Sequence, residues 1–352
     1  AVRKIVDSCL AILDKNGLTL DDIDYFIPHQ ANLRIIKDSA KALHLPLEKV
    51  VINIDQYGNT TAGTIPLAMQ TARQKGLLKK GDLVVLASPS PHLAAVSALV
   101  DEQVPVVTLS DDLTDLRALL ALGSAARAGG VAAVIGAGMA PGLSGLLARY
   151  LAAQVPVLDE LHVATHGTAG PACARGHHHA LGHTALGWHD GEWIEPPGGT
   201  GRDLVWFPEP IEAHDCYRAA VGDPLLLHRS FPEVSRISAR VSASRRDRLT
   251  ARLPMLTPPH AEGDLGAVRV EARGADADGA RITLIAGAAG ATADLAAAVA
   301  AATALRLLAV GVAPGVHSLS DTTVEQLDVL HHATSFGVKV QEFTGVARAT
   351  HW

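Results

Sequence analysis

The sequence predicts an α/β fold in which layered βα repeats are followed by an α+β domain with an antiparallel sheet. Over residues 1–153, apolar runs of strand length alternate with amphipathic runs of helix length, as in layered α/β domains. After residue 153, short strand-like runs are separated by loops rich in glycine, proline and histidine, which favours antiparallel pairing. With 352 residues, 48% hydrophobic residues and a net charge of -6, the chain is long enough for two domains and lacks the basic surplus of a nucleic-acid-binding protein.

In the first half of the chain, hydrophobic periodicity predicts helices that alternate with short buried strands. The expected helices are residues 3–16, 32–43, 64–75, 92–102, 113–127 and 144–153. The expected strands are residues 23–28, 50–54, 83–87, 104–109 and 131–135. Asn16 and Gly17 end the first helix with a residue pair that helix C-termini prefer, and Gly76 closes the third.

The second half is expected to mix short strands with loops and to end in helices. Strands are predicted at residues 160–164, 237–242, 268–272 and 281–286, helices at 293–308 and 323–335, and a last strand at 338–343. Because Arg306 interrupts the apolar run 295–312, we expect a buried or interfacial helix there and no membrane span. The three cysteines are odd in number and far apart, which excludes a disulfide framework and fits the cytoplasm.

The composition of the chain changes abruptly near residue 80. Eight of the nine lysines and all four asparagines lie in residues 1–80, whereas eighteen arginines lie after residue 80 and three before it. Such a shift predicts a domain junction at this point. The chain also begins at Ala1 inside an expected helix, as a fragment of a longer protein would.

Two polar segments follow the first two predicted strands. His29 lies in PHQANLR and Asn59 in YGNTTA, both at strand exits, where α/β proteins collect catalytic residues. A neutral histidine and an asparagine side by side could donate two hydrogen bonds to one developing oxyanion. By residue type alone, a polar helix cap at Asn32 and a glycine turn at Gly58 are the favoured explanation.

Residues 1–88 closely resemble the C-terminal half of the thiolase-like β-ketoacyl-acyl-carrier-protein synthase III, the condensing acyltransferase that starts bacterial fatty acid biosynthesis. The resemblance is carried by IDYFIPHQANLRII, DQYGNTTAGTIPLA and GLLKKGDLVVLAS. It implies that His29 and Asn59 are two of three catalytic residues and steady the carbonyl oxygen during malonyl decarboxylation and condensation. It also implies that Gln30, Ala31, Asn32, Leu33 and Arg34 meet the acyl carrier protein, with Arg34 as the contact to a phosphate or carboxylate.

The third catalytic residue of that family is an acyl-accepting cysteine, and it belongs to an N-terminal half without a counterpart here. Cys9 falls within the first predicted helix, where we expect it to be buried as a small hydrophobe. Because the nucleophile forms the acyl-enzyme, this sequence on its own does not support covalent acyl transfer. The family's final glycine-rich turn and strand also do not follow Ser88.

From about residue 82 onward the chain resembles a second family, the saccharopine dehydrogenase-like oxidoreductases. The matching segments are LVVLASPSPHLAAV, VPVVTLSDDLTDLRALL, VIGAGMAPGLS, ELHVATHGTAGPACAR, CYRAAVGDP and SRRDRLTARLPMLTPPH. The resemblance implies a Rossmann domain for NAD(P), an amino-acid-derived substrate and the contact of a homodimer. The expected parts are the synthase-like half at 1–88, later βα units of a Rossmann-like domain at 89–153, a substrate and dimerisation domain at 154–292, and helices and a strand returning to the Rossmann-like domain at 293–352.

The segment GAGMAP at residues 136–141 only partly matches a dinucleotide-binding fingerprint. Pro141 stands in place of the third glycine, and no acidic residue follows a second strand at the expected distance. By resemblance, Gly136, Gly138 and Pro141 form a late turn beside the nicotinamide end of the site. The family's true fingerprint belongs to a first βαβ unit that this sequence lacks, so NAD(P) is implied by the resemblance alone.

Several side chains in the second part are candidates for binding an anionic substrate. By resemblance the first choices are His166, Thr168, Tyr217 and Arg218. Arg175 and Arg245 are candidate carboxylate clamps, with solvated surface arginines as the alternative. The histidines between residues 162 and 189 invite a metal site, but no second spaced pair of ligands recurs, so no metal is expected.

Three functions stay open, and with them the question whether the chain is an enzyme. The first is a chimera with half of a condensing enzyme and most of a dehydrogenase, in which neither reaction is complete. The second is a working NAD(P)-dependent oxidoreductase with a borrowed first segment, and the third is a non-catalytic module that binds acyl carrier protein. The missing nucleophile and phosphate cradle favour the first. LVVLAS suits both families and is the expected junction.

Overall fold

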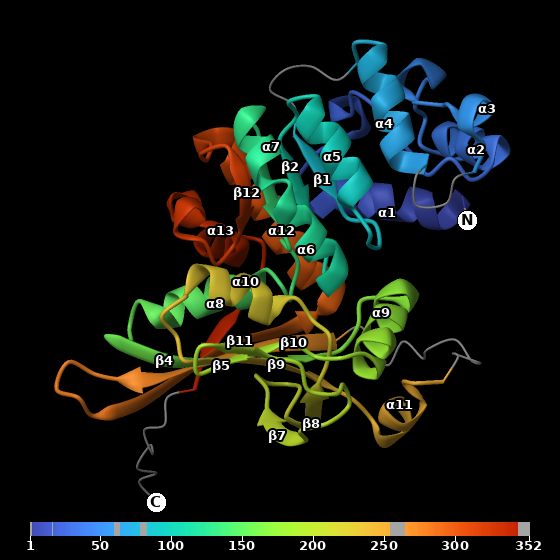
Figure 1. The fold of residues 1–352 in the computed structure, drawn as a ribbon. Helices are drawn as coiled ribbons and strands as arrows, with labels where there is room; N and C mark the ends of the chain where they lie inside the picture. The colour runs from blue at the N-terminus through green and yellow to red at the C-terminus, as the bar shows by residue number, and fades with distance from the viewer. Residues whose placement is uncertain (1, 16, 60–63, 78–82, 254–264, 344–352) are drawn as a thin grey trace, which may run out of the picture. The chain divides into compact units, whose positions relative to one another are not determined.

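The structure is a computed structural model, and it describes residues 2–15, 17–59, 64–77, 83–253 and 265–343 (Figure 1). Its internal contacts divide the chain into two compact units. Unit 1 consists of residues 1–82 and 93–104, and unit 2 consists of residues 83–92 and 105–352. Neither unit is therefore a continuous stretch of the sequence.

Unit 1 is built from helices around two small apolar clusters. Its elements are α1 (Val2–Lys15), η1 (Leu20–Asp22), α2 (Leu33–Ala42), η2 (Leu47–Lys49), α3 (Ile54–Tyr57), α4 (Thr64–Gln74) and α5 (Leu93–Asp101), where η marks a 3₁₀-helix. Asn32 caps α2, because its Oδ1 accepts the backbone N–H of Arg34 at 2.9 Å. One cluster holds Ile36, Ala40 and Val50, and the other holds Val51, Ala68 and Ala72.

The prediction of two strands in this unit is wrong. Residues 23–28 and 50–54 lie side by side, but they pair only through a parallel bridge between Phe26 and Val50, and Ile54 already begins α3. A strand is stabilised by its neighbours, and the third predicted strand, β1 (Val84–Leu86), pairs with β2 (Val106–Thr108) in unit 2. Among the described residues, the two segments are left without a further partner from which a sheet could grow.

Unit 2 contains a four-stranded sheet in the order β1-β2-β3-β12, and every pairing in it is parallel. β3 spans Ala132–Ile135 and β12 spans Gly315–Ser318. The helices α6 (Leu113–Ala121), α7 (Gly123–Ala128) and α8 (Leu143–Ala152) follow β2 and β3, so the predicted βα alternation is confirmed here. Because the strands are parallel, their carboxyl ends share one edge of the sheet, where α/β folds bind ligands.

The second sheet of unit 2 has nine strands in the order β13-β11-β10-β4-β9-β5-β6, with β8 paired to β9 and β7 to β8. The bounds are β4 (Val157–His166), β5 (Gly187–His189), β6 (Glu192–Ile194), β7 (Asp203–Trp206), β8 (Ala213–Arg218), β9 (Arg236–Ser242), β10 (Leu265–Ala275), β11 (Arg281–Ala291) and β13 (Val340–Glu342). β4 and β9 run parallel and the other pairs run antiparallel, so the sheet is mixed where an antiparallel one was expected.

Helices α8, α10 (Asp223–Ser230) and α12 (Thr292–Val310) pack on one face of the large sheet (Figure 1). Leu147, Leu227 and Val299 from these helices share one core cluster with Leu161 and Val268 from the strands. By length and composition α12 could cross a membrane. Val299 and its neighbours are buried in this core, whereas Leu305 and Leu308 are exposed, so the expectation of a buried or interfacial helix stays a prediction.

The remaining elements of unit 2 were not predicted as they occur. They are α9 (Pro171–Gly182), α11 (Arg245–Thr250), η4 (Thr322–Leu327) and α13 (Val329–Ser335). One helix was expected over residues 323–335, but Asp328 has a left-handed φ of 48° and separates η4 from α13. The last predicted strand is β13 and pairs with β11, whereas the unpredicted β12 joins the parallel sheet.

Candidate functional site

The residues expected to form an oxyanion site lie in loops of unit 1. The side chain of His29 is exposed, and its Nδ1 is hydrogen-bonded to Oγ1 of Thr64 at the start of α4. Asn59 is exposed in the loop after α3, directly before residues 60–63, which lie outside the described residues. His29 therefore contacts the start of α4, which is the next described helix after the loop that holds Asn59.

Gln30, which was expected to meet the acyl carrier protein, is fully buried. Its Nε2 donates to the carbonyl oxygens of Pro28 at 2.8 Å and Val51 at 3.1 Å. Its Oε1 accepts the backbone N–H of Asn53 at 3.1 Å. The side chain therefore ties the His29 segment to residues 51–53 and presents no surface to a partner.

The exposed part of the expected acyl-carrier segment is the first turn of α2. Leu33 is 40% exposed, and the side chain of Arg34 is 90% exposed, with a 3.7 Å ion pair to Asp38 one turn later. Ala31 is half-buried and donates its N–H to the carbonyl of His29 at 2.9 Å. An apolar and a cationic side chain next to each other suit a partner with apolar and anionic groups.

The thiols of the chain are all in environments that favour the protonated form. Burial raises the pKa of Cys9 in α1 and of Cys173 in α9. Burial also raises the pKa of Cys216 in β8 to about 12. Because the thiolate is the nucleophilic form, all three are weak nucleophiles at neutral pH.

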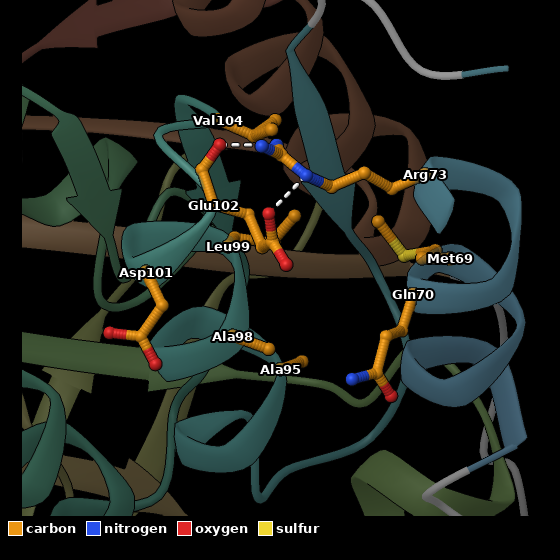
Figure 2. A pocket seen from close by; sticks show the side chains of 9 residues that line it. All are labelled: Met69, Gln70, Arg73, Ala95, Ala98, Leu99, Asp101, Glu102 and Val104. Carbon is orange, nitrogen blue, oxygen red and sulfur yellow. Dashed lines mark hydrogen bonds and ion pairs between the residues drawn. The ribbon is translucent and has the colours of Figure 1, made fainter. Parts of the chain in front are cut away.

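A cleft of unit 1 lies between α4 and α5 (Figure 2). Its lining is Met69, Gln70, Arg73, Ala95, Ala98, Leu99, Asp101, Glu102 and Val104. The guanidinium of Arg73 pairs with the carboxylate of Glu102 and donates to its backbone carbonyl (Figure 2). The two side chains are 35% and 40% exposed, so we expect this pair to add little stability.

In unit 2, Gly136, Gly138 and Pro141 lie in the turn between β3 and α8, at the carboxyl edge of the parallel sheet. A Cβ on Gly136 would lie 2.8 Å from Cγ of Pro141, and one on Gly142 would lie 2.1 Å from the carbonyl oxygen of Gly138. The N–H of Gly138 donates to the carbonyl of Pro141 at 3.0 Å. The glycines thus allow the turn to close on itself.

The start of α8 is also occupied by the turn that precedes it. The N–H groups of Leu143 and Ser144 donate to the carbonyls of Gly138 at 2.9 Å and Met139 at 3.1 Å. In a dinucleotide site, amides at this position bind the pyrophosphate, and glycines leave room for its approach. The residues of this turn therefore do not fit the pyrophosphate of NAD(P).

A buried carboxyl group lies next to this turn, and the sequence did not reveal it. Oγ of Ser144 donates to Oδ1 of Asp223, which is 2% exposed at the start of α10. Burial raises the pKa of Asp223 to about 6. The hydrogen bond from Ser144 lowers this pKa, and the charge of Asp111 raises it further. Because Ser144 and Asp223 are 79 residues apart in the sequence, no local sequence pattern predicts their hydrogen bond.

The exits of β1 and β2 are joined through His92, which is 2% exposed. Its Nδ1 is hydrogen-bonded to Oγ1 of Thr108 and its Nε2 to the carbonyl of Ser88. Its backbone N–H donates to Oδ2 of Asp115 at 2.8 Å, which also accepts from Oγ of Ser110 at 2.6 Å. Burial lowers the pKa of His92. With both ring nitrogens bonded, this histidine links the exits of the two strands.

The predicted substrate residues divide between the two faces of the large sheet. Nδ1 of His166 is 2.9 Å from Oγ of Ser242, and the His166 ring lies 4.0 Å from that of His214. Burial lowers the pKa of His166 to about 4, with His214 and His177 adding to the effect. Thr168 is half-buried in the loop that follows.

Tyr217 and Arg218 alternate along β8, so their side chains point to opposite faces. Tyr217 is buried with Leu181, and the guanidinium of Arg248 lies 5.4 Å from its ring centroid. The side chains of Arg175 in α9 and Arg245 in α11 are exposed. The roles of these residues stay predictions. Among the described residues, no group of three or more His, Cys, Asp or Glu side chains could hold a metal ion.

Comparison with protein families separates the beginning of the chain from the remainder. Residues 13–101 match the model of the 3-oxoacyl-[acyl-carrier-protein (ACP)] synthase III C terminal. The first part of the chain is synthase-like. The match runs past Ser88 and covers α5, which also belongs to unit 1.

Curated relatives agree with this match over the same part of the chain. The beta-ketoacyl-[acyl-carrier-protein] synthase III of Koribacter versatilis is 58% identical over 88 residues, which are 25% of this chain and 26% of that protein. The synthase III of Paracoccus denitrificans is 52% identical over 94 residues, which are 27% of this chain and 29% of that protein. The chain thus spans about a quarter of the length of these relatives.

Solved dehydrogenase structures resemble most of the chain in fold. Apo saccharopine dehydrogenase (L-Glu forming) from Saccharomyces cerevisiae has a TM-score of 0.60 and 14% identity, covering 89% of this chain and 93% of its own. Homospermidine synthase from Legionella pneumophila, in complex with NAD, has a TM-score of 0.56 and 12% identity, covering 87% and 82%. The chain is therefore chimeric, with a synthase-like segment and a dehydrogenase-like fold.

Proposed function

We propose that this chimera carries a partial 3-oxoacyl-ACP synthase III and most of a saccharopine dehydrogenase-like oxidoreductase, and that it completes neither reaction. The main support on the synthase side is the state of its thiols. Acyl transfer needs a thiolate beside the oxyanion donors, and burial keeps Cys9, Cys173 and Cys216 protonated.

The support on the dehydrogenase side is that the described segments after β1 and β2 contain no glycine-rich phosphate turn, while the turn between β3 and α8 is closed on itself. Gly136 and Gly142 serve the packing of that turn, and the first amides of α8 are bonded to Gly138 and Met139. NAD(P), an amino-acid-derived substrate, a homodimer and a cytoplasmic location stay predictions that rest on the dehydrogenase likeness.

Intact-mass spectrometry after incubation with acetyl-coenzyme A tests the synthase side. We expect no acetyl adduct on the native chain, while a complete synthase III, run in parallel, gains one. A stoichiometric thioester on any of the three cysteines would refute this part of the proposal.

Fluorescence titration with NADH and NADPH tests the dehydrogenase side. We expect no saturable binding at millimolar concentration, because the exits of β1 (SPSPH) and β2 (SDDL) carry no glycine-rich phosphate turn. Saturable binding of either nucleotide would favour a working oxidoreductase instead.

A second function, docking of acyl carrier protein, is favoured by the exposed Leu33 and Arg34 at the start of α2. A pull-down with acyl carrier protein should retain the chain, and Arg34→Glu should abolish retention because it reverses the contact charge. Arg3→Glu is the matched control, since Arg3 is also exposed and paired with an aspartate one turn later. Equal loss in both variants would indicate unspecific charge attraction.

His29 and Asn59, the expected oxyanion pair, allow slow malonyl decarboxylation to be tested as well. If His29 and Asn59 still steady a carbonyl oxygen, the chain should decarboxylate malonyl groups slowly, and His29→Ala should abolish this. Decarboxylation that survives His29→Ala would exclude the pair as its cause.

A further inference from the structure

A charged pocket lies on the face of the large sheet that points away from the helices α8, α10 and α12. Strand alternation places Leu161, Val163 and Val268 in the core beneath those helices, so their neighbours along the strands point to the other side. The pocket is lined by His162, Val163, Ala164, Asp203, Val205, Arg236, Arg240, Arg269, Glu271 and Arg273. None of the predicted site residues is among them.

Two arginines face each other across the smallest side chain of the pocket. In the sheet register Ala164 of β4 is paired with Arg240 of β9 on one side and with Arg269 of β10 on the other. Neighbouring strands lie about 4.8 Å apart, so the two arginine backbones are separated by roughly 10 Å. Ala164 adds only a methyl group to the lining between the two strands that carry these arginines.

Two acidic side chains of this face, Glu271 and Glu160, are bonded to arginines and the histidine of the pocket itself. Glu271 accepts from Arg269 at 2.6 Å and from Arg273 at 2.5 Å. Glu160 is 2.8 Å from Nε2 of His162 and 3.4 Å from Arg273. Burial lowers the pKa of His162, so this ring carries no charge at neutral pH. The four lining arginines therefore exceed the two lining acids, Asp203 and Glu271.

Arg240 has only a weak acidic partner, and its guanidinium otherwise donates to the carbonyl of Gly201 and to Oγ of Ser238, each at 3.2 Å. Its side chain is 18% exposed, and its acidic neighbour Asp203 is 3.9 Å away and 56% exposed. Burial lowers the pKa of Arg240, Asp203 opposes this, and the nearby Arg218 and Arg236 add to the lowering. An added negative charge would relieve this repulsion.

Arg269 carries a buried hydrogen-bond donor that lacks an acceptor within the described part of the chain. Its side chain is 15% exposed, and its Nε is buried without a hydrogen-bond partner among the described residues. A buried donor without an acceptor is destabilising, and a ligand oxygen in the pocket could satisfy it.

We propose that this pocket binds a small dianion, held through carboxylate or phosphoryl oxygens by the guanidinium groups of Arg240 and Arg269. Planar guanidinium groups bind such oxygens in pairs, which gives both affinity and orientation. The site is separate from the carboxyl edge of the parallel sheet and does not depend on the proposed function.

Calorimetric titration of the full chain with inorganic phosphate and with succinate, at low ionic strength, tests the site. We expect saturable binding of at least one of them, with one site per chain. Arg240→Gln should weaken the affinity about 10- to 100-fold, which is the range for losing a charge-assisted hydrogen-bonded contact. The affinity of Arg240→Lys should lie between those of the unchanged chain and of Arg240→Gln, because lysine keeps the charge and loses the paired hydrogen-bond geometry.

Arg281→Gln is the matched control, since Arg281 is a 63% exposed arginine of β11 outside the pocket. Its affinity should equal that of the unchanged chain. The proposal is overturned if neither anion binds at millimolar concentration, or if Arg281→Gln weakens binding as much as Arg240→Gln. It is also overturned if Arg240→Gln only dissociates a dimer of this chain, because the face would then serve a second copy.

Discussion

At the scale of single residues, the side chains that matter most to the two candidate sites are buried and polar. Gln30 joins two loop segments behind His29, and Asp223 lies behind the turn that follows β3. Both are buried and hydrogen-bonded within the fold, so their substitution should change stability before it changes any binding.

Gln30→Leu should lower the local stability of unit 1 by about 2–4 kcal/mol, because two buried carbonyls and one N–H lose their partner. Hydrogen exchange of α2 peptides, followed by mass spectrometry, measures this change. Gln70→Leu on the exposed side of α4 is the control and should leave the exchange unchanged. Unchanged protection in Gln30→Leu would mean that the three bonds do not support the loop.

Asp223→Asn should remove a pH dependence from the stability of unit 2. The folded pKa of about 6 lies above the ordinary value of 3.8, so the carboxyl group stabilises the fold fully below pH 3.8 and this contribution is lost as pH rises through 6. The variant should therefore gain on the order of 1–3 kcal/mol over the unchanged chain above pH 6.

Urea unfolding at several pH values, followed by tryptophan fluorescence, measures this gain, since all four tryptophans belong to unit 2. Asp101→Asn replaces an exposed aspartate and is the control. A constant difference between Asp223→Asn and the unchanged chain from pH 4 to 8 would contradict the raised pKa.

At the scale of elements, the sequence predicted what local patterns determine. The helices α1, α2 and α4 were found because their apolar spacing and the Asn32 cap are local signals. The strands at 23–28 and 50–54 failed, since a strand needs a neighbour that no local pattern specifies. β12 (GVHS) was missed because Val316 is its only large apolar residue, and β5 to β8 and α10 were not predicted either.

The residues of the candidate sites were likewise predicted where the signal is local and missed where it depends on tertiary contacts. His29 and Asn59 were recognised from motifs, whereas the burial of Gln30 and the pairing of Ser144 with Asp223 depend on tertiary structure. The Arg240 and Arg269 pocket is also invisible in the sequence, because strand order alone places Ala164 between them.

The turn that joins β3 to α8 allows a direct test at this scale. Gly142 has a φ of 131° and no room for a Cβ, so Gly142→Ala should destabilise unit 2 by at least about 3 kcal/mol. Gly130→Ala, with a φ of 68° and open space around it, should cost only about 1–2 kcal/mol. Tryptophan fluorescence in urea compares the two, and equal losses would show that the turn tolerates a side chain.

At the scale of the whole molecule, the two units differ in how much apolar surface they bury. Among the described residues, unit 1 has small clusters around Ile36 and Val51, while one large cluster spans the helices and both sheets of unit 2. Hydrophobic burial is the main favourable term in folding, so unit 1 should open first. Hydrogen exchange should be faster in α2 and α4 than in β4, β10 and β11, and the reverse order would contradict this ranking.

The discontinuous course of the chain has a consequence for any cut at the junction near Ser88. The backbone crosses from one unit to the other after residues 82, 92 and 104, with β1 given to one unit and α5 to the other. A truncation that removes everything after Ser88 would leave β1 without β2 and take α5 away from the helices of unit 1. One that removes everything up to Ser88 would take β1 away from β2 and leave α5 without the other helices of unit 1, so a cut at this junction leaves neither unit complete.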